Sequence, residues 1–89
     1  MFDWDEANID HIALHDVEPE EAEAALTDPH RHLIARRTVR NEQRIIYIGA
    51  TESGRALVVV YTRRGERLRV VTAREATAEE VRRWRRQQK

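Results

Sequence analysis

Residues 43–74 read QRIIYIGATESGRALVVVYTRRGERLRVVTAR, and this stretch decides the fold of the chain. It holds three runs rich in β-branched and aromatic residues, at 43–51, 55–63 and 68–74, and such runs favour β-strands. The segments between them, ESGR and RRGER, are typical of a turn and of a tight hairpin with a glycine. The stretch therefore predicts three consecutive strands of an antiparallel sheet.

The residues before this stretch predict an edge strand preceded by two helices. Residues 30–37, HRHLIARR, are more polar than the three runs and indicate a weak strand at the border of the sheet. Asp5 is a good N-cap for a first helix that runs to about Leu14. Pro19 occupies the first position of a second helix, which ends at Pro29.

The first helix shows two different faces on a helical wheel. The apolar stripe is expected to pack inward and consists of Ile9, Ile12 and Ala13. A polar flank lies away from this stripe and carries Asn8, His11 and His15. The two histidines are therefore expected outside the core, either as simply exposed side chains or as part of a functional polar face.

The end of the chain predicts a closing helix. Thr77 is its expected cap, with Glu80 three residues later as a capping box requires, and the helix continues through AEEVRRWRRQQ. The opening residues FDW form a short apolar segment with strand character. The expected order is β-α-α-β-β-β-β-α within one domain over residues 1–89, an α+β fold whose antiparallel sheet packs against helices.

The charges of the 89-residue chain are segregated, although its net charge is zero. Residues 1–29 contain ten acidic residues and neither Lys nor Arg, whereas residues 30–89 contain all 16 basic residues and only six acids. Such segregation is the expected footprint of a surface that binds a polyanion such as a nucleic acid, although solvated helix and strand faces produce it too. The absence of cysteine, of an apolar signal segment and of a membrane-length apolar run agrees with a cytoplasmic protein that binds no membrane.

Arginines crowd the last hairpin and the strand that follows it. The segment TRRGERLRVVTAREA contains Arg63, Arg64, Arg67, Arg69 and Arg74. A sheet face with several guanidinium groups can bind a phosphate bidentately and stabilise developing negative charge. In the closing helix Trp84 lies among further arginines, where its ring could stack on a base or, together with Val81, anchor the helix to the sheet.

The four histidines of the chain offer an alternative site. His11 and His15 have the spacing with which a helix can present two metal ligands, and His30 and His32 would share one face of a strand. The chain has no cysteine and no HExxH glutamate, and no pattern brings the two pairs together. We therefore predict neither a metal site nor another cofactor, and keep a small histidine-based metalloprotein as a rival hypothesis.

Over nearly its whole length the chain resembles the BrnT family of toxins from bacterial type II toxin–antitoxin pairs. The resemblance is carried by the opening F-x-W-D, by a first-helix histidine followed shortly by a valine, and by the closing segment RVVTAREATAEEVRRW. The closing segment has the following residues at matching positions: Arg69, Thr72, Arg74, Ala76, Glu80 and Trp84. Where the family usually has a cation and a tyrosine, this chain has Leu14 and Trp84.

The resemblance implies a RelE-like fold and a metal-independent ribonuclease that halts translation by cutting RNA. It also implies a small antitoxin, often of ribbon-helix-helix type, and a toxin–antitoxin complex that binds operator DNA. In the expected mechanism the RNA 2′-hydroxyl attacks the adjacent phosphate, protons are transferred by His15 or Glu80, and Arg69 and Arg74 hold the phosphate. Substrate contacts are expected from His11, Arg44, Arg63 and Trp84.

The spacing of the two phosphate-holding arginines leaves alternatives open. Arg69 and Arg74 are five residues apart, so in a regular strand they point to opposite faces. Either a bulge or the strand end redirects one of them, or only one belongs to the site. Leu14 and Trp84 also allow a second hypothesis, in which the chain binds antitoxin, DNA or RNA but has lost catalytic activity.

Overall fold

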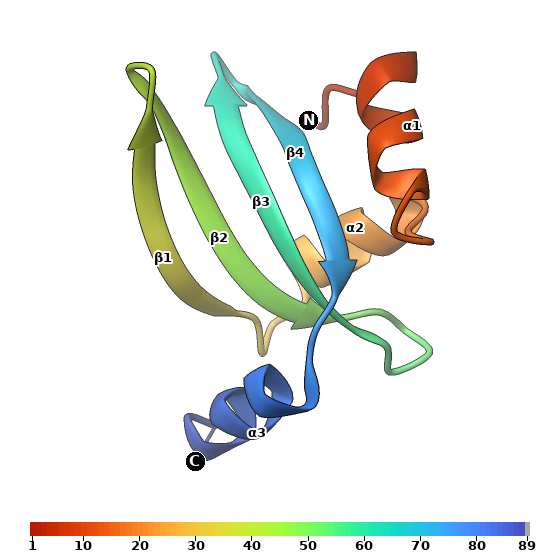
Figure 1. Cartoon of the computed structure of the whole chain (residues 1–89), viewed down its shortest axis with the longest axis vertical. Helices are drawn as coiled ribbons and strands as arrows, with labels where there is room; N and C mark the ends of the chain where they lie inside the picture. Colours follow the sequence, from red (N-terminus) through yellow and green to blue (C-terminus); the bar gives the residue numbers. More distant parts are fainter. Residues whose placement is uncertain (89) are drawn as a thin grey trace.

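An antiparallel sheet of four strands forms the centre of the computed structural model, which describes residues 1–88. The strands are β1 (His32–Val39), β2 (Glu42–Ala50), β3 (Ala56–Arg64) and β4 (Arg67–Glu75), and they lie in chain order (Figure 1). Helices α1 (Glu6–Ala13) and α2 (Pro19–Thr27) precede the sheet, and α3 (Ala78–Arg86) follows it. The predicted α+β class and element order are confirmed, with the opening strand reduced to one parallel bridge between Phe2 and Leu68.

Capping residues define the starts of the helices as the sequence predicts. The Asp5 side chain accepts the backbone N–H of Asn8, whose own side chain accepts the N–H of Asp5. Thr77 and Glu80 make the same reciprocal pair at α3, and Pro19 begins α2. Each pair satisfies two backbone donors that a helix start leaves open, so the positions of α1 and α3 are specified locally.

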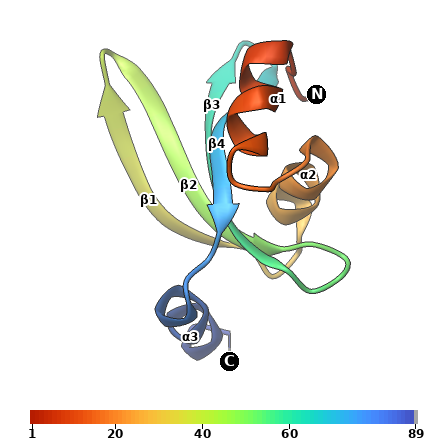
Figure 2. The ribbon, with the colours of Figure 1, turned by 45° about the vertical axis from the view of Figure 1, so that its right-hand side comes forward.

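The core lies between the helices α1 and α2 and the sheet face that they cover (Figure 2). The strands contribute alternating buried residues, chiefly Ile45, Leu57, Val59, Tyr61, Val70 and Ala73. The helical layer contributes Ile12, Val17, Ala22, Ala25 and Leu26. Gly49 lets α2 approach the sheet closely, because a Cβ at this position would lie 2.1 Å from the carbonyl oxygen of Ala25.

The faces of α1 differ in part from the prediction. Ile12 is fully buried, but Ala13 is exposed, and Asn8, which was expected on the polar flank, is only 6% exposed. The Asn8 Nδ2 donates to the carbonyl oxygens of Asp3 and Val70, so it ties α1 to the N-terminal segment and to β4. The reason is that α1 packs beside β4 at the border of the sheet, where backbone carbonyls without a strand partner accept a buried amide.

A β-bulge in β4 decides which side chains share a sheet face. The pairing register shifts between Val60 and Tyr61 of β3, and this leaves Val71 of β4 as an extra residue. Because the extra residue changes the alternation by one position, Arg69 and Arg74 both lie on the face opposite the helices. The sequence left open how Arg69 and Arg74 could share a face, and the structure shows that a bulge brings this about.

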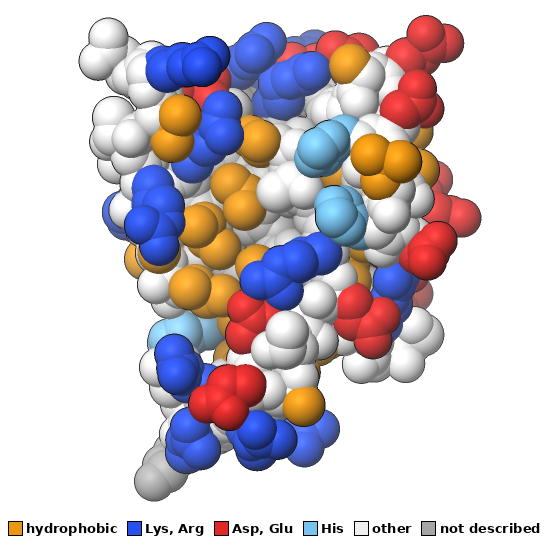
Figure 3. All heavy atoms as spheres, viewed as in Figure 1, with side chains coloured by type: hydrophobic (Ala, Val, Ile, Leu, Met, Phe, Trp, Pro, Cys, Tyr) orange, Lys and Arg blue, Asp and Glu red, His pale blue; other side chains and the backbone are white. Residues whose placement is uncertain are grey.

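We call the sheet face turned away from α1 and α2 the open face (Figure 3). On β2, β3 and β4 its residues include Arg44, Ile46 and Ile48 of β2, Val58, Val60, Thr62 and Arg64 of β3, and Arg69, Thr72 and Arg74 of β4. Hydrophobic side chains run along its middle, arginines gather around them, and histidines of α1 lie along one border. Helix α3 stands off the lower end of the sheet and has no fully buried residue (Figures 1 and 2). Within residues 1–88 no helix has the length and apolar character needed to cross a membrane.

Candidate functional site

A basic hollow of about 250 Å³ lies at the end of the open face where β3 turns into β4, beside α1. Its polar lining consists of Asn8, His11, Glu42, Arg44, Thr62, Arg64 and Arg69. Of the residues predicted for the site, His11, Arg44 and Arg69 therefore meet in one place. A histidine among several guanidinium groups is suited to bind a phosphate and to exchange a proton with a group attached to it.

The strand register positions the arginines of this hollow. Arg44 stands opposite Thr62, and Thr62 stands opposite Arg69, so the three side chains form a row across the open face. Thr62 is 3% exposed and donates its hydroxyl proton to the carbonyl oxygen of Gln43, which leaves the two arginines as the accessible members of the row. Arg64 lies two residues farther along β3 and therefore points to the same face.

Arg69 is held in place by acidic residues of the N-terminal segment. Its Nη2 lies 2.9 Å from Asp5 Oδ2, its Nη1 lies 3.9 Å from Asp3 Oδ2, and its side chain is 17% exposed. The pKa of Asp5 is lowered, first by the hydrogen bond from the backbone N–H of Asn8 and further by Arg69. An anion entering the basic hollow thus meets an Arg69 side chain that is fixed in position and partly neutralised.

His11 and His15 lie one turn apart on α1, with 6.1 Å between their ring centroids and 71° between their ring planes. Both side chains are exposed, as the helical wheel predicts. His11 lines the basic hollow, whereas His15 lies next to His11 and outside this lining. The structure therefore places the two imidazoles as neighbours, with His11 facing the arginines.

A second cluster joins the end of β4 to α3. Nη1 and Nη2 of Arg74 donate to Oε1 and Oε2 of Glu80, each over 2.8 Å. Arg74, together with the backbone N–H of Thr77, lowers the pKa of Glu80 to about 2. At neutral pH Glu80 is an ionised carboxylate with little tendency to take up a proton, which argues against the proton-transfer role expected for it.

Trp84 anchors α3 to the chain segment before β1. Its Nε1 donates to the carbonyl oxygen of His30 over 2.9 Å, and the side chain of Gln88 donates to the same oxygen over 2.7 Å. Trp84 also lines a second cavity of about 320 Å³, which we call the α3 groove; its other walls are His32, Leu33, Ile34, Ile48, Glu80, Arg83 and Gln87. Trp84 therefore attaches α3 through a polar contact to the segment before β1, not through apolar packing with Val81 on the sheet, and it lies apart from the basic hollow.

Arg63 does not join the other predicted arginines. It stands opposite Leu68, which packs against the core, so it lies on the helix-covered side of the sheet. Its neighbour Arg64, which belongs to the same run of arginines but was not among the expected substrate contacts, lines the basic hollow instead. The alternation of side chains along β3 is the sequence signal that could have placed Arg64 in the site. Thr62 and Arg64 share one face of the sheet once the hairpin at Gly65 fixes the register.

The four histidines do not assemble. His30 precedes β1, so it does not share a strand face with His32 as the metal hypothesis requires. In the part of the chain that the structure describes, no three His, Asp or Glu side chains are arranged to hold a metal ion. The histidine-based metal hypothesis therefore lacks a ligand set among residues 1–88.

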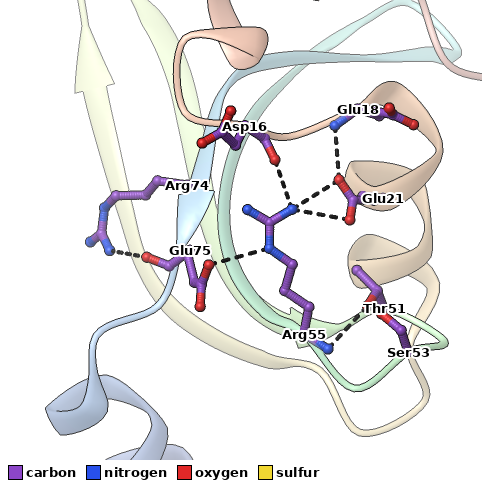
Figure 4. A network of polar contacts seen from close by, with 8 residues as sticks. All are labelled: Asp16, Glu18, Glu21, Thr51, Ser53, Arg55, Arg74 and Glu75. Atoms are coloured by element: carbon purple, nitrogen blue, oxygen red, sulfur yellow. Dashed lines mark hydrogen bonds and ion pairs between the residues drawn. The ribbon is translucent and has the colours of Figure 1, made fainter.

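Arg55 connects three segments behind the end of β4 (Figure 4). Its Nη1 donates to the carbonyl oxygen of Asp16 over 2.7 Å and to both carboxylate oxygens of Glu21 over 3.0 Å. Its Nε donates to Glu75 Oε1 over 3.3 Å, while Arg74 donates to the backbone carbonyl of Glu75. Arg55 thus fixes the corner between α1 and α2 relative to the strand that carries Arg74.

These features define a class of protein: a small α+β domain in which a histidine of the first helix faces arginines on the open face of the sheet. A family model described as "Ribonuclease toxin, BrnT, of type II toxin-antitoxin system" matches residues 4–80. The chain therefore belongs to the BrnT family of ribonuclease toxins, as its sequence motifs indicated. A search of curated proteins gave no match. Membership in this family implies an RNA substrate and an antitoxin partner.

Proposed function

We propose that the chain is a metal-independent endoribonuclease that inhibits translation by cleaving RNA in the basic hollow. The observation that carries the proposal is the position of His11, which shares this hollow with Arg44, Arg64 and Arg69 in a member of a ribonuclease toxin family. The arrangement of two helices ahead of a four-stranded antiparallel sheet agrees with the RelE-like fold that we expect for such an enzyme.

In the proposed reaction the 2′-oxygen of RNA forms a bond to the adjacent phosphorus, and the bond from phosphorus to the 5′-oxygen breaks. One imidazole of the pair His11 and His15 takes the proton of the 2′-hydroxyl, and the other, in its protonated form, delivers a proton to the departing 5′-oxygen. The products are a 2′,3′-cyclic phosphate and a 5′-hydroxyl. A separation of 6.1 Å between the ring centroids supports this assignment, because two imidazoles this close together can reach the same phosphodiester.

The arginines supply the charge stabilisation that this reaction needs. Arg44 and Arg64 face the hollow and would bind the non-bridging phosphate oxygens, where negative charge increases in the transition state. Arg69, held by Asp5, would position the phosphate next to His11. Arg74 lies farther along the open face, where it would contact a neighbouring phosphate of the bound RNA.

The test is cleavage of single-stranded RNA by the purified chain in the presence of EDTA, with analysis of the product ends. We expect 2′,3′-cyclic ends, and a loss of about 10²–10⁴-fold in rate for His11→Ala, since one proton-transfer group is removed. His30→Ala is the matched control, because His30 lies before β1 and outside the hollow. RNA left intact by the wild-type chain, or equal rates for both variants, would exclude the proposed mechanism.

A non-cleaving binding module is the second candidate function. Leu14, at the position where the family usually has a cation, is 78% exposed and contributes no charge. Arg69 and Arg74 are both engaged by acidic side chains. Unaffected growth on induced expression, together with intact RNA in the purified system, would favour this candidate, whereas growth arrest that the neighbouring gene relieves would support the toxin.

We also propose that the antitoxin is a small protein of ribbon-helix-helix type. In this proposal the two proteins meet in the bacterial cytoplasm, and only their complex binds operator DNA. Family membership supports the antitoxin itself, and the basic character of residues 30–89 agrees with a chain that works on nucleic acid. Electrophoretic mobility of operator DNA with the toxin, the antitoxin and the complex would test the DNA part.

A further inference from the structure

The outer edge of β1 is uncovered. At the opposite border of the sheet, Leu68 of β4 exchanges backbone hydrogen bonds with Met1 and Asp3, and α1 packs alongside. In residues 1–88, β1 pairs with β2 alone, so the backbone N–H and C=O groups of its outer edge have no strand partner. A free strand edge of this kind can accept an additional strand from another chain.

The side chains along this edge are strongly cationic. Residues 30–41 contain no acidic residue and four arginines: Arg31, Arg36, Arg37 and Arg40. None of these four forms an ion pair within residues 1–88, whereas the arginines elsewhere at Arg55, Arg69 and Arg74 do. The edge therefore carries positive charge that the described part of the chain leaves unbalanced.

The α3 groove lies at the beginning of the same strand. Ile34 is the extra residue of a β-bulge in β1, is 47% exposed, and lines the groove together with Ile48 and Trp84. The groove is also lined by Arg83 and Glu80, and each of them is paired within the chain: Arg83 with Glu79, and Glu80 with Arg74. The groove of about 320 Å³ thus continues the strand edge with an apolar cavity that can take an aliphatic side chain.

We infer that the edge of β1 and the α3 groove together bind an extended segment of the antitoxin that alternates acidic and β-branched residues. The segment adds to the sheet as a fifth strand. Its aliphatic side chains lie on the open face, where one of them enters the α3 groove, and its carboxylates lie on the other face, where they pair with Arg36. This inference rests on the proposed toxin function for the identity of the partner, but on the strand edge and the groove for its chemistry.

Charge and backbone chemistry favour an acidic peptide at the edge of β1 over two other possible partners, a second copy of the chain and RNA. A second copy pairing β1 with β1 would place two cationic segments against each other, which disfavours a dimer through this edge. RNA would satisfy the arginines, but it has no row of amide groups with which to continue a β-ladder. An acidic extended peptide satisfies the backbone edge, the arginines and the apolar groove at once.

The test uses a synthetic ten-residue peptide that alternates Glu with Val and Ile, added to the full chain. Two matched peptides carry Lys in place of Glu or N-methyl groups on alternate amides. We expect the acidic peptide to slow amide hydrogen exchange in β1, and each matched peptide to bind at least about tenfold more weakly. The variant Arg36→Glu should reverse the preference in favour of the Lys peptide.

Equal binding of the three peptides, protection centred on the basic hollow, or displacement of the peptide from β1 by a polyuridine oligonucleotide would overturn the inference. RNA cleavage by the same wild-type preparation is measured in parallel. A chain that binds the acidic peptide through β1 but leaves RNA intact would contradict the proposed nuclease function alone. A chain that cleaves RNA but shows no protection of β1 would contradict this inference alone.

Discussion

Arg74 and Glu80 face each other through two parallel hydrogen bonds of 2.8 Å, which join the end of β4 to the first turn of α3. This pair is significant because α3 has no fully buried residue. The other attachment of α3 is the carbonyl oxygen of His30, which accepts from Trp84 and Gln88. The position of α3, and with it the α3 groove, therefore depends on a small number of polar contacts.

Replacing Glu80 by Gln should reduce the acid sensitivity of the folded chain. The pKa of Glu80 is lowered from 4.5 to about 2, so folding favours the ionised form. The resulting stabilisation is fully present above the unfolded value near 4.5 and is lost as the pH falls through about 2. We expect the wild type to lose about 1–2 kcal/mol more than Glu80→Gln across this window, since solvent screens the partly exposed pair. Urea unfolding at several pH values measures the difference, and parallel pH profiles for the two proteins would contradict it.

The neighbouring arginines Arg63 and Arg64 should differ in their effect on RNA cleavage. Arg64 lines the basic hollow, whereas Arg63 lies on the opposite side of the sheet. Arg64→Ala should lower the cleavage rate by about 10–100-fold, because a guanidinium is lost near the developing charge, whereas Arg63→Ala should stay within about twofold. Both variants truncate an exposed arginine at one strand end, so their unfolding curves should agree. Equal kinetic effects would show that the hollow is not where RNA reacts.

Helix starts and strand runs of this chain can be predicted because they depend on near neighbours. Asp5, Pro19 and Thr77 mark the three helices correctly, since a cap involves residues within one turn. The hairpin at Gly65 is equally local, because its positive φ of 61° suits glycine and so fixes the turn position.

The assembly of the site depends on contacts that a single sequence does not reveal. Asn8 is polar and lies on the predicted polar flank, yet its amide is buried against the carbonyl of Val70, 62 residues away. The bulge at Val71 exists only relative to the pairing strand β3, so the common face of Arg69 and Arg74 follows from the sheet and not from their spacing. The family resemblance supplies a nuclease function, but the fold decides that His11 faces the arginines.

Replacing Gly49 by Ala should destabilise the chain by about 2–4 kcal/mol. A Cβ at this position would lie 2.1 Å from the oxygen and 2.9 Å from the carbon of the Ala25 carbonyl, so α2 would have to move off the sheet. Thermal and urea unfolding measure the loss. Thr38→Ala, at an exposed position of β1, is the control and should change stability by less than about 0.5 kcal/mol. A Gly49→Ala protein as stable as the wild type would mean that α2 does not pack directly on β2.

Replacing Asn8 by Ala should lower both the stability of the fold and the rate of RNA cleavage. The variant leaves the carbonyl of Val70 without its buried donor and removes one half of the capping box, at an expected cost of about 1–3 kcal/mol. Because Asn8 lies one turn before His11, α1 also loses a tie to β4 beside the basic hollow. We expect a roughly tenfold slower cleavage by the folded fraction, since the imidazole is held less well against the arginines.

The variant Asn8→Asp separates the two roles of this side chain. A carboxylate keeps the acceptor that caps the N–H of Asp5, but it has no donor for Val70 and places a negative charge beside that carbonyl oxygen. If the tie to β4 matters, Asn8→Asp is at least as destabilised and as slow as Asn8→Ala. If only the cap matters, Asn8→Asp matches the wild type in both measurements. Asp10→Ala, at an exposed position of the same helix, is the control and should leave the cleavage rate within about twofold. This result would show that a substitution in α1 does not by itself slow cleavage.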